Sequence, residues 1–193
     1  MSDYPPQDGR RHEPLPEPHP DWHVIESVPE YETGWFVAGY DRVEQPDGTE
    51  KRYYWAELPT AVVITAVTDD HVLFVEQYRP TIRHEQLELP AGVVEAGESA
   101  TAAAERELEE ETGFCADSLS VLEEVWVATG VLRHKRAYVF AEGLTPTQQD
   151  LDDSEFLTPR AVPADEALPT ARSRPLNEAT LQGLTLADEE GLL

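Results

Sequence analysis

The order of predicted elements favours an α/β or α+β layered domain. Strand-like runs lie before and after one strong helix, and two short helices end the chain. The clearest strand is 61–68, whose continuous apolar run is typical of a buried central strand. The clearest helix is 99–112, because Ser99 can cap its start, alanines fill its interior and Gly113 can end it. A length of 193 residues suits one domain with a small appendage.

The part before the central strand predicts a leader and a small β unit. Residues 1–21 are rich in proline and poor in apolar residues, so we expect a flexible leader. Residues 22–25 have the pattern of a short strand, and runs 35–43 and 51–58 flank the turn signal Gln45-Pro46-Asp47-Gly48. Residues 22–58 therefore predict an antiparallel β unit rich in aromatic side chains, followed by the main domain at 59–193.

The remaining elements continue this alternation. After a turn at 69–70, residues 72–75 return as a strand, and the short apolar segment 87–94 is interrupted by Pro90-Ala91-Gly92. Beyond the central helix, residues 119–127 and 136–140 predict strands. Residues 163–168 and 177–186 predict short helices.

The charge balance is strongly acidic, with 39 Asp and Glu against 14 Lys and Arg and a formal net charge of -25. Such a surface repels phosphate backbones, so we expect no nucleic-acid partner. The acids are spread along the chain, which favours adaptation to high salt, where screening acts over about 3 Å at 1 M. We hypothesise a halophilic source. In this chain a glutamate cluster is by default solvated surface, so any functional carboxylate needs a further argument.

The sequence contains neither a candidate membrane-spanning segment nor a pair of cysteines. The longest mainly apolar run, 61–67, is far shorter than the roughly 20 residues of a membrane-spanning helix, and residues 1–21 lack the apolar core of a secretory signal. Cys115 is the single cysteine, which excludes an intrachain disulfide and a cysteine-based zinc site. We therefore expect no membrane partner and a reducing, cytoplasmic location.

Three acids on the central helix carry the strongest chemical signal. Glu107, Glu110 and Glu111 lie three or four residues apart, so their carboxylates share one helix face and repel one another. This arrangement makes sense if a cation lies between them. Oxygen ligands at this density favour a hard ion, Mg²⁺ or alternatively Mn²⁺.

The residues around these acids suit the same site. Arg106 is spaced to pair with Glu98 or Glu110 and to hold the acidic face in register. Gly92 and Gly97 allow a tight turn before the helix. That turn can bring a backbone carbonyl, such as that of Ala91, to the metal.

Together these residues match the Nudix signature: Gly, five residues, Glu, seven residues, Arg-Glu-aliphatic, one residue, Glu-Glu, one residue, Gly-aliphatic. The matching positions are Gly92, Glu98, Arg106, Glu107, Leu108, Glu110, Glu111, Gly113 and Phe114. The chain is therefore identified as resembling Nudix hydrolases.

The Nudix resemblance implies a fold and a set of roles. The fold is an α/β/α sandwich with a mixed sheet, here with the small N-terminal antiparallel β unit. Glu107 and Glu111 would ligate Mg²⁺, with Glu110 and the Ala91 carbonyl completing the cluster and all three glutamates serving catalysis. Gly92, Glu98, Arg106 and Gly113 would be structural. The metal would polarise a phosphoryl oxygen and activate water for in-line attack.

The flanking sequence narrows the resemblance. Gln77-Tyr78-Arg79 followed by Glu88-Leu89-Pro90-Ala91-Gly92 is similar to the ADP-ribose pyrophosphatase branch. In that branch the N-terminal β unit often exchanges between subunits, which implies a homodimer. Arg79 is a candidate for binding the diphosphate or the terminal ribose, with a surface arginine as the alternative. Trp35 is a candidate for stacking on the base, with a core aromatic as the alternative.

Two departures from that branch concern the loop after the central helix. Thr129-Gly130 stands where a Pro-Gly pair is common, and residues 131–136 contain no acid in place of a loop glutamate. His134 could act as the base instead. Arg133 and its basic neighbours Lys135 and Arg136 suggest anion binding, although a loop that balances local acids fits equally well.

We expect hydrolysis of ADP-ribose, or a related nucleoside diphosphate sugar, to a nucleoside monophosphate and a sugar phosphate. GDP-mannose, NADH and dinucleoside polyphosphates stay open as substrates, whereas the flanks disfavour oxidised triphosphates. A non-catalytic nucleotide-sugar sensor with this fold is the alternative, and the intact acids argue against it. Isopentenyl diphosphate isomerase activity needs a reactive cysteine, and Cys115 lies outside the expected position.

Overall fold

The computed structural model describes residues 10–151 and 155–193, which form two compact units. The first contains the described residues up to Thr60 together with 94–97 and 125–136. The second contains 61–93, 98–124 and the described residues from 137 onward. The first unit thus contains residues from the expected β unit (22–58) and from the expected main domain (59–193). The domain boundary between residues 58 and 59 stays a prediction.

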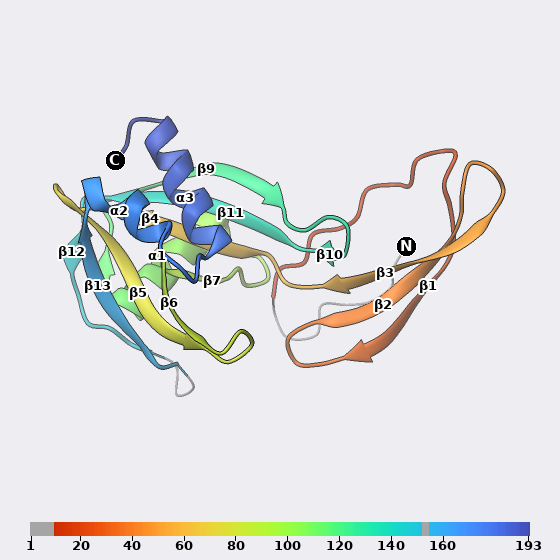
Figure 1. The fold of residues 1–193 in the computed structure, drawn as a ribbon, viewed down its shortest axis with the longest axis horizontal. Coiled ribbons are helices and arrows are strands. Elements are labelled where there is room, and N and C mark those ends of the chain that lie inside the picture. The colour runs from red at the N-terminus through yellow and green to blue at the C-terminus, as the bar shows by residue number, and fades with distance from the viewer. Residues whose placement is uncertain (1–9, 152–154) are drawn as a thin grey trace. The chain divides into compact units, whose positions relative to one another are not determined.

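The first unit is built on a four-stranded sheet in the order β1-β2-β3-β10 (Figure 1). Strands β1 (His23–Glu32), β2 (Val37–Glu44) and β3 (Glu50–Glu57) are antiparallel neighbours, and β10 (Leu132–Arg133) runs parallel to β3. The turn between β2 and β3 uses the left-handed conformation of Gly48, φ 81°. The predicted hairpin is confirmed, although β1 is longer than the short strand expected at 22–25.

The expected leader falls partly outside the described residues, which begin at Arg10. Within the described part, the Arg11 backbone joins two strand ends, because its N–H donates to Val94 and its carbonyl accepts from Thr60. Arg10 also forms an isolated β-bridge with Glu95. Residues 10–11 are therefore attached to the first unit.

The second unit contains two larger sheets and a short pair. One sheet has the order β7-β4-β11-β9, formed by β4 (Ala61–Ala66), β7 (Ala91–Val93), β9 (Ser118–Trp126) and β11 (Lys135–Glu142). The other has the order β13-β5-β6, formed by β5 (His71–Arg79), β6 (His84–Glu88) and β13 (Leu157–Pro163). The short strands β8 (Phe114–Cys115) and β12 (Thr145–Pro146) pair with each other.

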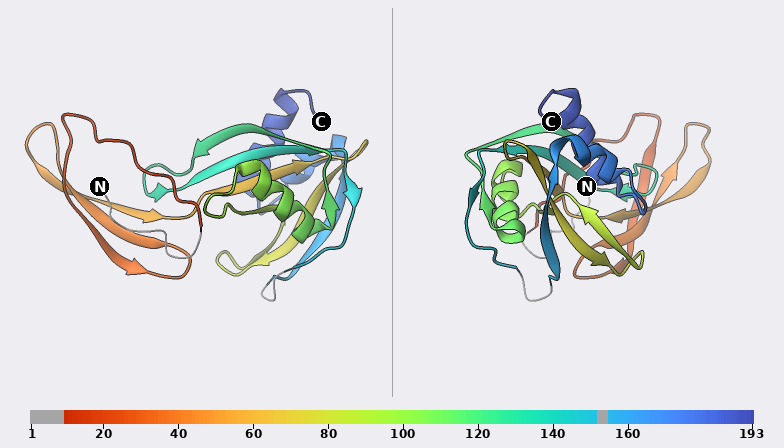
Figure 2. Two further views of the ribbon diagram at one scale, coloured as in Figure 1. Left: turned by 180° about the vertical axis from the view of Figure 1, so that it is seen from behind. Right: turned by 60° about the vertical axis from the view of Figure 1, so that its left-hand side comes forward.

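Helices cover both faces of the β4 sheet. Helix α1 (Ala100–Thr112) contacts β4 and β7, while α3 (Glu178–Glu189) contacts β4 and the short helix α2 (Ala164–Ala171). Figures 1 and 2 show α1 and α3 on opposite sides of this sheet. Gly183 allows close packing of α3, since a Cβ there would lie 2.8 Å from Leu89 Cδ1. The α/β prediction, with helices on both sides of a sheet, is confirmed.

The central elements agree with the sequence. Val62, Ile64 and Ala66 of β4 are fully buried, as a central strand requires. Helix α1 is capped by the Ser99 side chain, which accepts from the Ala102 N–H, and ends at Gly113 with φ 72°. None of the helices in the described ranges is long and apolar enough to cross a membrane.

Candidate active site

Glu111 is the buried end of the acidic face of α1. Its carboxylate accepts a 2.9 Å hydrogen bond from the Ala91 N–H, which ties the helix to β7. The pKa of Glu111 is raised to about 8, chiefly by burial and to a smaller extent by the negative charges of Glu107 and Glu155. The Ala91 N–H and the charge of Arg79 act in the opposite direction. Glu111 is thus an acid whose charged form lacks compensation from the protein.

Gly92 makes room for the second acid of this face. A Cβ atom at Gly92 would lie 1.8 Å from Cδ of Glu107, so any larger residue would displace this carboxylate. Burial raises the pKa of Glu107, while the neighbouring Arg106 opposes the shift. The signature glycine therefore has a packing reason: it lets a backbone and a carboxylate approach closely.

Arg106 uses all its donors within this site. Its Nη1 donates to Glu107 at 2.8 Å and to Glu110 at 3.0 Å. Its Nη2 donates to the Val93 carbonyl at 2.9 Å and to Glu98 at 3.1 Å, and Nε donates to Glu98 at 3.2 Å. Burial lowers the pKa of Arg106, but the bonds to Glu98 and Glu107 outweigh it and the net shift is upward. Arg106 thus pairs with both partners that its spacing predicts.

The donor set of this face suits a hard divalent cation. Glu107, Glu110 and Glu111 offer carboxylate oxygens only, and the pKa values of Glu107 and Glu111 are raised, first by burial and then by neighbouring negative charges. As the side chains stand, no group of three acids, histidines or cysteines within 10–151 and 155–193 is arranged to hold a metal ion. One carboxylate oxygen each of Glu107 and Glu110 accepts from Arg106, and one of Glu111 accepts from the Ala91 N–H.

A fourth acid, Glu155, lies near this face and was missed by the sequence analysis. Its negative charge contributes to the raised pKa of both Glu107 and Glu111. The segment before it is attached to the end of α1 by hydrogen bonds to backbone carbonyls, from Thr147 to Gly113, from Gln149 to Glu111 and from Asp150 to Glu110. No local sequence signal marks Glu155, because it lies far along the chain from the acids of α1 that its charge affects.

A cleft of about 650 Å³ opens beside α1. It is lined by residues of the helix and of the attached segment, namely Ala102, Glu105, Arg106, Glu109, Glu110, Gln148 and Asp150. The outer edge of the acidic face therefore borders a space that solvent can fill.

Arg79 lies on the same unit, at the end of β5. Its Nε and Nη2 bind the buried carboxylate of Glu88, with Nη2 at 2.5 Å from Oε2. The side chain is 43% exposed. Its positive charge lowers the pKa of Glu111, which places it within electrostatic reach of the acidic face.

Arg133 occupies a different environment, inside the first unit. Its Nη2 donates to Asp41, its Nη1 lies 3.8 Å from Glu57, and its guanidinium stacks 4.0 Å from the centre of the Trp55 ring. Burial lowers the pKa of Arg133, and the two acids oppose this. The geometry favours the loop that balances local acids over an anion-binding loop.

His134 and Trp35 also belong to the first unit, whereas the acids of α1 belong to the second. The His134 side chain is buried, and its Nδ1 lies 2.8 Å from the Pro59 carbonyl oxygen. Trp35 is 64% exposed, and the Arg10 guanidinium lies 4.2 Å from its ring centre. Trp35 is thus a surface aromatic and not a core residue.

Comparison with known proteins identifies similar sequences and folds. Residues 57–182 match the family model of the NUDIX domain. The chain is 33% identical to an ADP-ribose pyrophosphatase of Bacillus subtilis (strain 168), over 71% of this chain and 76% of that protein. It is 31% identical to the ADP compounds hydrolase NudE of Escherichia coli (strain K12), over 67% and 71%.

One further protein is similar in sequence, and one solved structure is similar in fold. A methanol dehydrogenase activator of Bacillus methanolicus is 34% identical over 66% of this chain and 71% of that protein. A crystal structure of an ADP compounds hydrolase superposes with a TM-score of 0.81 at 24% identity, covering 92% of this chain and all of that one. This structural similarity shows that the two proteins share a fold, with helices on both faces of the β4 sheet in this chain.

We predict that Glu111→Gln stabilises the protein in EDTA at pH 8. The folded-state pKa of about 8 exceeds the ordinary 4.5, so the folded protein binds more protons and loses stability as pH rises through this window. Glutamine removes that loss, and the free energy of unfolding should rise by on the order of a few kcal/mol at pH 8. The gain should shrink toward pH 4.5.

Urea unfolding at fixed KCl concentration measures this effect. Glu109→Gln is the matched control, because Glu109 lies exposed on the same helix, and its substitution should leave stability nearly unchanged. A Glu111→Gln variant that is less stable than the parent at pH 8 would contradict the interpretation of Glu111 as an uncompensated buried acid.

Proposed function

The chain belongs to the NUDIX domain family, and from this premise we propose that it hydrolyses the pyrophosphate bond of ADP-ribose or a related nucleoside diphosphate sugar. Water attacks one phosphorus, the bridging P–O bond breaks, and a nucleoside monophosphate and a sugar phosphate leave. The observation that carries the proposal is the buried acidic face of α1, where Glu107 and Glu111 lie together with raised pKa values. The likeness to an ADP-ribose pyrophosphatase over most of the chain supports the substrate class.

The proposal includes a divalent cation, Mg²⁺ or alternatively Mn²⁺. Glu107, Glu110 and Glu111, with the Ala91 carbonyl, are the groups that would hold it. When bound, the ion supplies positive charge to the diphosphate oxygens and to the attacking water. Arg106 and Glu98 hold the carboxylates in position, and Gly92 keeps the space that Glu107 needs.

We assign the role of general base to Glu155 in preference to His134. Glu155 lies close enough to Glu107 and Glu111 for its charge to raise both of their pKa values. A carboxylate there can accept the proton of the attacking water at one oxygen. The buried His134 ring contacts the Pro59 carbonyl through Nδ1, which suits a structural role.

Arg79 and Trp35 are proposed to bind the substrate. The half-exposed guanidinium of Arg79, near Glu111, can donate to diphosphate oxygens. The exposed ring of Trp35 offers a face for stacking on a base. Arg133 is instead assigned to holding β10 beside Asp41.

A homodimer through the first unit is part of the proposal. The unit exposes large hydrophobic side chains, and those between 40% and 64% exposed on it include Val24, Ile25, Tyr31, Trp35 and Tyr54. Exposed apolar groups gathered on one unit favour contact with a second copy of the chain. A location in the reducing cytoplasm fits the single cysteine, Cys115.

A second candidate function rests on the similarity to a methanol dehydrogenase activator. In that case the chain would activate a partner enzyme by hydrolysing a nucleotide. A sensor would instead bind a nucleotide without turnover. The intact acidic face favours an enzyme that hydrolyses a nucleotide over a sensor without turnover.

We predict that the purified protein, in high KCl with Mg²⁺, releases AMP from ADP-ribose. The test compares ADP-ribose with GDP-mannose, UDP-glucose, NADH and dGTP, with products resolved by chromatography. Glu111→Gln should reduce turnover by orders of magnitude, because it removes one carboxylate of the proposed metal cluster. Turnover of another compound would keep the chemistry and change the substrate, and turnover of none with Mg²⁺ or Mn²⁺ would favour the sensor.

We predict that Glu155→Gln lowers kcat by roughly 10²- to 10⁴-fold, the range of general-base contributions, while the protein still binds ADP-ribose. His134→Gln, which keeps a group able to bond the Pro59 carbonyl, should change kcat far less. The measurement is steady-state kinetics from pH 6 to 10. A larger loss of kcat in the His134 variant than in the Glu155 variant would reverse the assignment.

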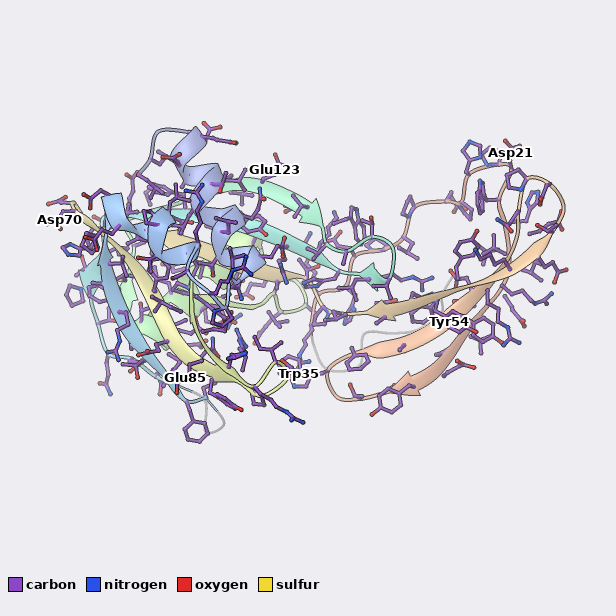
Figure 3. The ribbon with its side chains drawn as sticks, viewed as in Figure 1. Asp21, Trp35, Tyr54, Asp70, Glu85 and Glu123 are labelled. Atoms are coloured by element: carbon purple, nitrogen blue, oxygen red, sulfur yellow. The ribbon has the colours of Figure 1, made fainter. Side chains whose placement is uncertain are left out.

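We predict that thermal stability increases with KCl concentration, as expected for a halophilic protein. Acidic side chains such as Asp70, Glu85 and Glu123 lie at the surface of the second unit (Figure 3). Their mutual repulsion, within a net charge of -25, is screened by salt. Melting curves between low salt and 3 M KCl test this, and full stability at low salt would count against a halophilic source.

A further inference from the structure

Glu88 is a buried acid that joins three elements of the second unit. Its side chain is 5% exposed, and both carboxylate oxygens accept hydrogen bonds. Oε2 accepts from Arg79 Nη2 at 2.5 Å and from Gln77 Nε2 at 3.2 Å, both on β5. Oε1 accepts from Asn177 Nδ2 at 2.9 Å, from the residue that precedes α3. Arg79 therefore shares its buried acceptor with an amide far away in the sequence.

Asn177 has two separate tasks, one for each end of its amide. Its Oδ1 accepts the Thr180 N–H at 3.0 Å and so caps α3. Its Nδ2 donates to Glu88. Serine also caps helices well, but its side chain is too short to reach Glu88 in place of the amide. The two tasks can therefore be separated by substitution.

The first turn of α3 holds the segment that leads to the acidic face. The Leu89 N–H donates to Thr180 Oγ1 at 3.0 Å, in a buried contact. The Gln86 amide donates to the Pro175 carbonyl at 3.0 Å. Residues 86–89 continue directly into Ala91 and Gly92, which contact Glu111 and Glu107. The position of α3 is thus linked to that of the strand end.

Arg79 is the group in this network that can act on a ligand. Within the described part of the chain its bonds to Glu88 use Nε and Nη2, which leaves the Nη1 edge for another acceptor. The side chain is 43% exposed, so without a fixed partner it would sample several rotamers. Fixing it in advance lowers the entropy that a bound anion must overcome.

We propose that Asn177 is a positioning residue for Arg79, acting through Glu88, and that the first turn of α3 thereby tunes affinity for the diphosphate of the substrate. The inference rests on the proposed function, since it takes Arg79 as the diphosphate ligand. Asn177 orients the Glu88 carboxylate, and that carboxylate orients the guanidinium. The amide itself contacts no substrate.

The test compares Asn177→Ser with Asn177→Ala. Both remove the donor to Glu88, whereas Ala alone also removes the cap. We expect both variants to raise KM for ADP-ribose, on the order of five-fold, with little change in kcat. We expect Asn177→Ala alone to lower the melting temperature clearly. A KM that rises in Asn177→Ala but not in Asn177→Ser would follow the cap and overturn the proposal.

A double-mutant cycle with Arg79→Met tests the route of the effect. If Asn177 acts through Arg79, Asn177→Ser should have no further effect on KM in the Arg79→Met protein. Independent, additive effects would overturn the proposal. The same cycle is measured as the Kd of ADP-ribose in EDTA, which needs no turnover. Absence of hydrolysis by the parent chain would therefore count against the proposed function alone, while the Kd values decide the role of Asn177.

Discussion

The burial of negative charge on one face of α1 constrains the rest of the site. Glu111 is buried and Glu107 largely so, and burial is the main cause of the raised pKa of each. Such an arrangement persists only where the surrounding fold holds it in place. Three features do so here: the Ala91 N–H on Glu111, the missing Cβ of Gly92 beside Glu107, and the guanidinium of Arg106. Strand β7 and helix α1 therefore form one local framework around these acids.

Much of the framework around the acids could be predicted from the sequence, because the residues that determine it are close together in the chain. The cap at Ser99, the left-handed Gly113 and the spacing of the acids all lie within one continuous stretch. Strand β13 could not be predicted, since its two prolines argue against a strand. The structure accommodates them because β13 is an edge strand that pairs only with β5 in its sheet.

Residues whose roles the sequence left open, or that the sequence analysis missed, depend on distant partners. Glu155 acts by its charge on Glu107 and Glu111, and residues 147–150, shortly before it in the sequence, are attached to the end of α1. Arg133 has a basic neighbourhood in sequence, but its partner Asp41 lies 92 positions away. The local charge pattern left two interpretations open, an anion-binding loop and a loop that balances acids of the protein, and the contact of Arg133 with Asp41 favours the second. Partners of this kind follow from the fold and not from the motif.

Arg106 and Arg79, which both lie in the second unit, show how an acidic protein can divide its few cations between structure and binding. Arg106 makes five hydrogen bonds, which equals the number of N–H donors on a guanidinium, so it has none left for a ligand. Arg79 donates to Glu88 through Nε and Nη2 only. Both are fixed by carboxylates, but only one keeps donors available. With 14 Lys and Arg in the chain, the saturated guanidinium can fix the carboxylates while the other remains able to meet a phosphate.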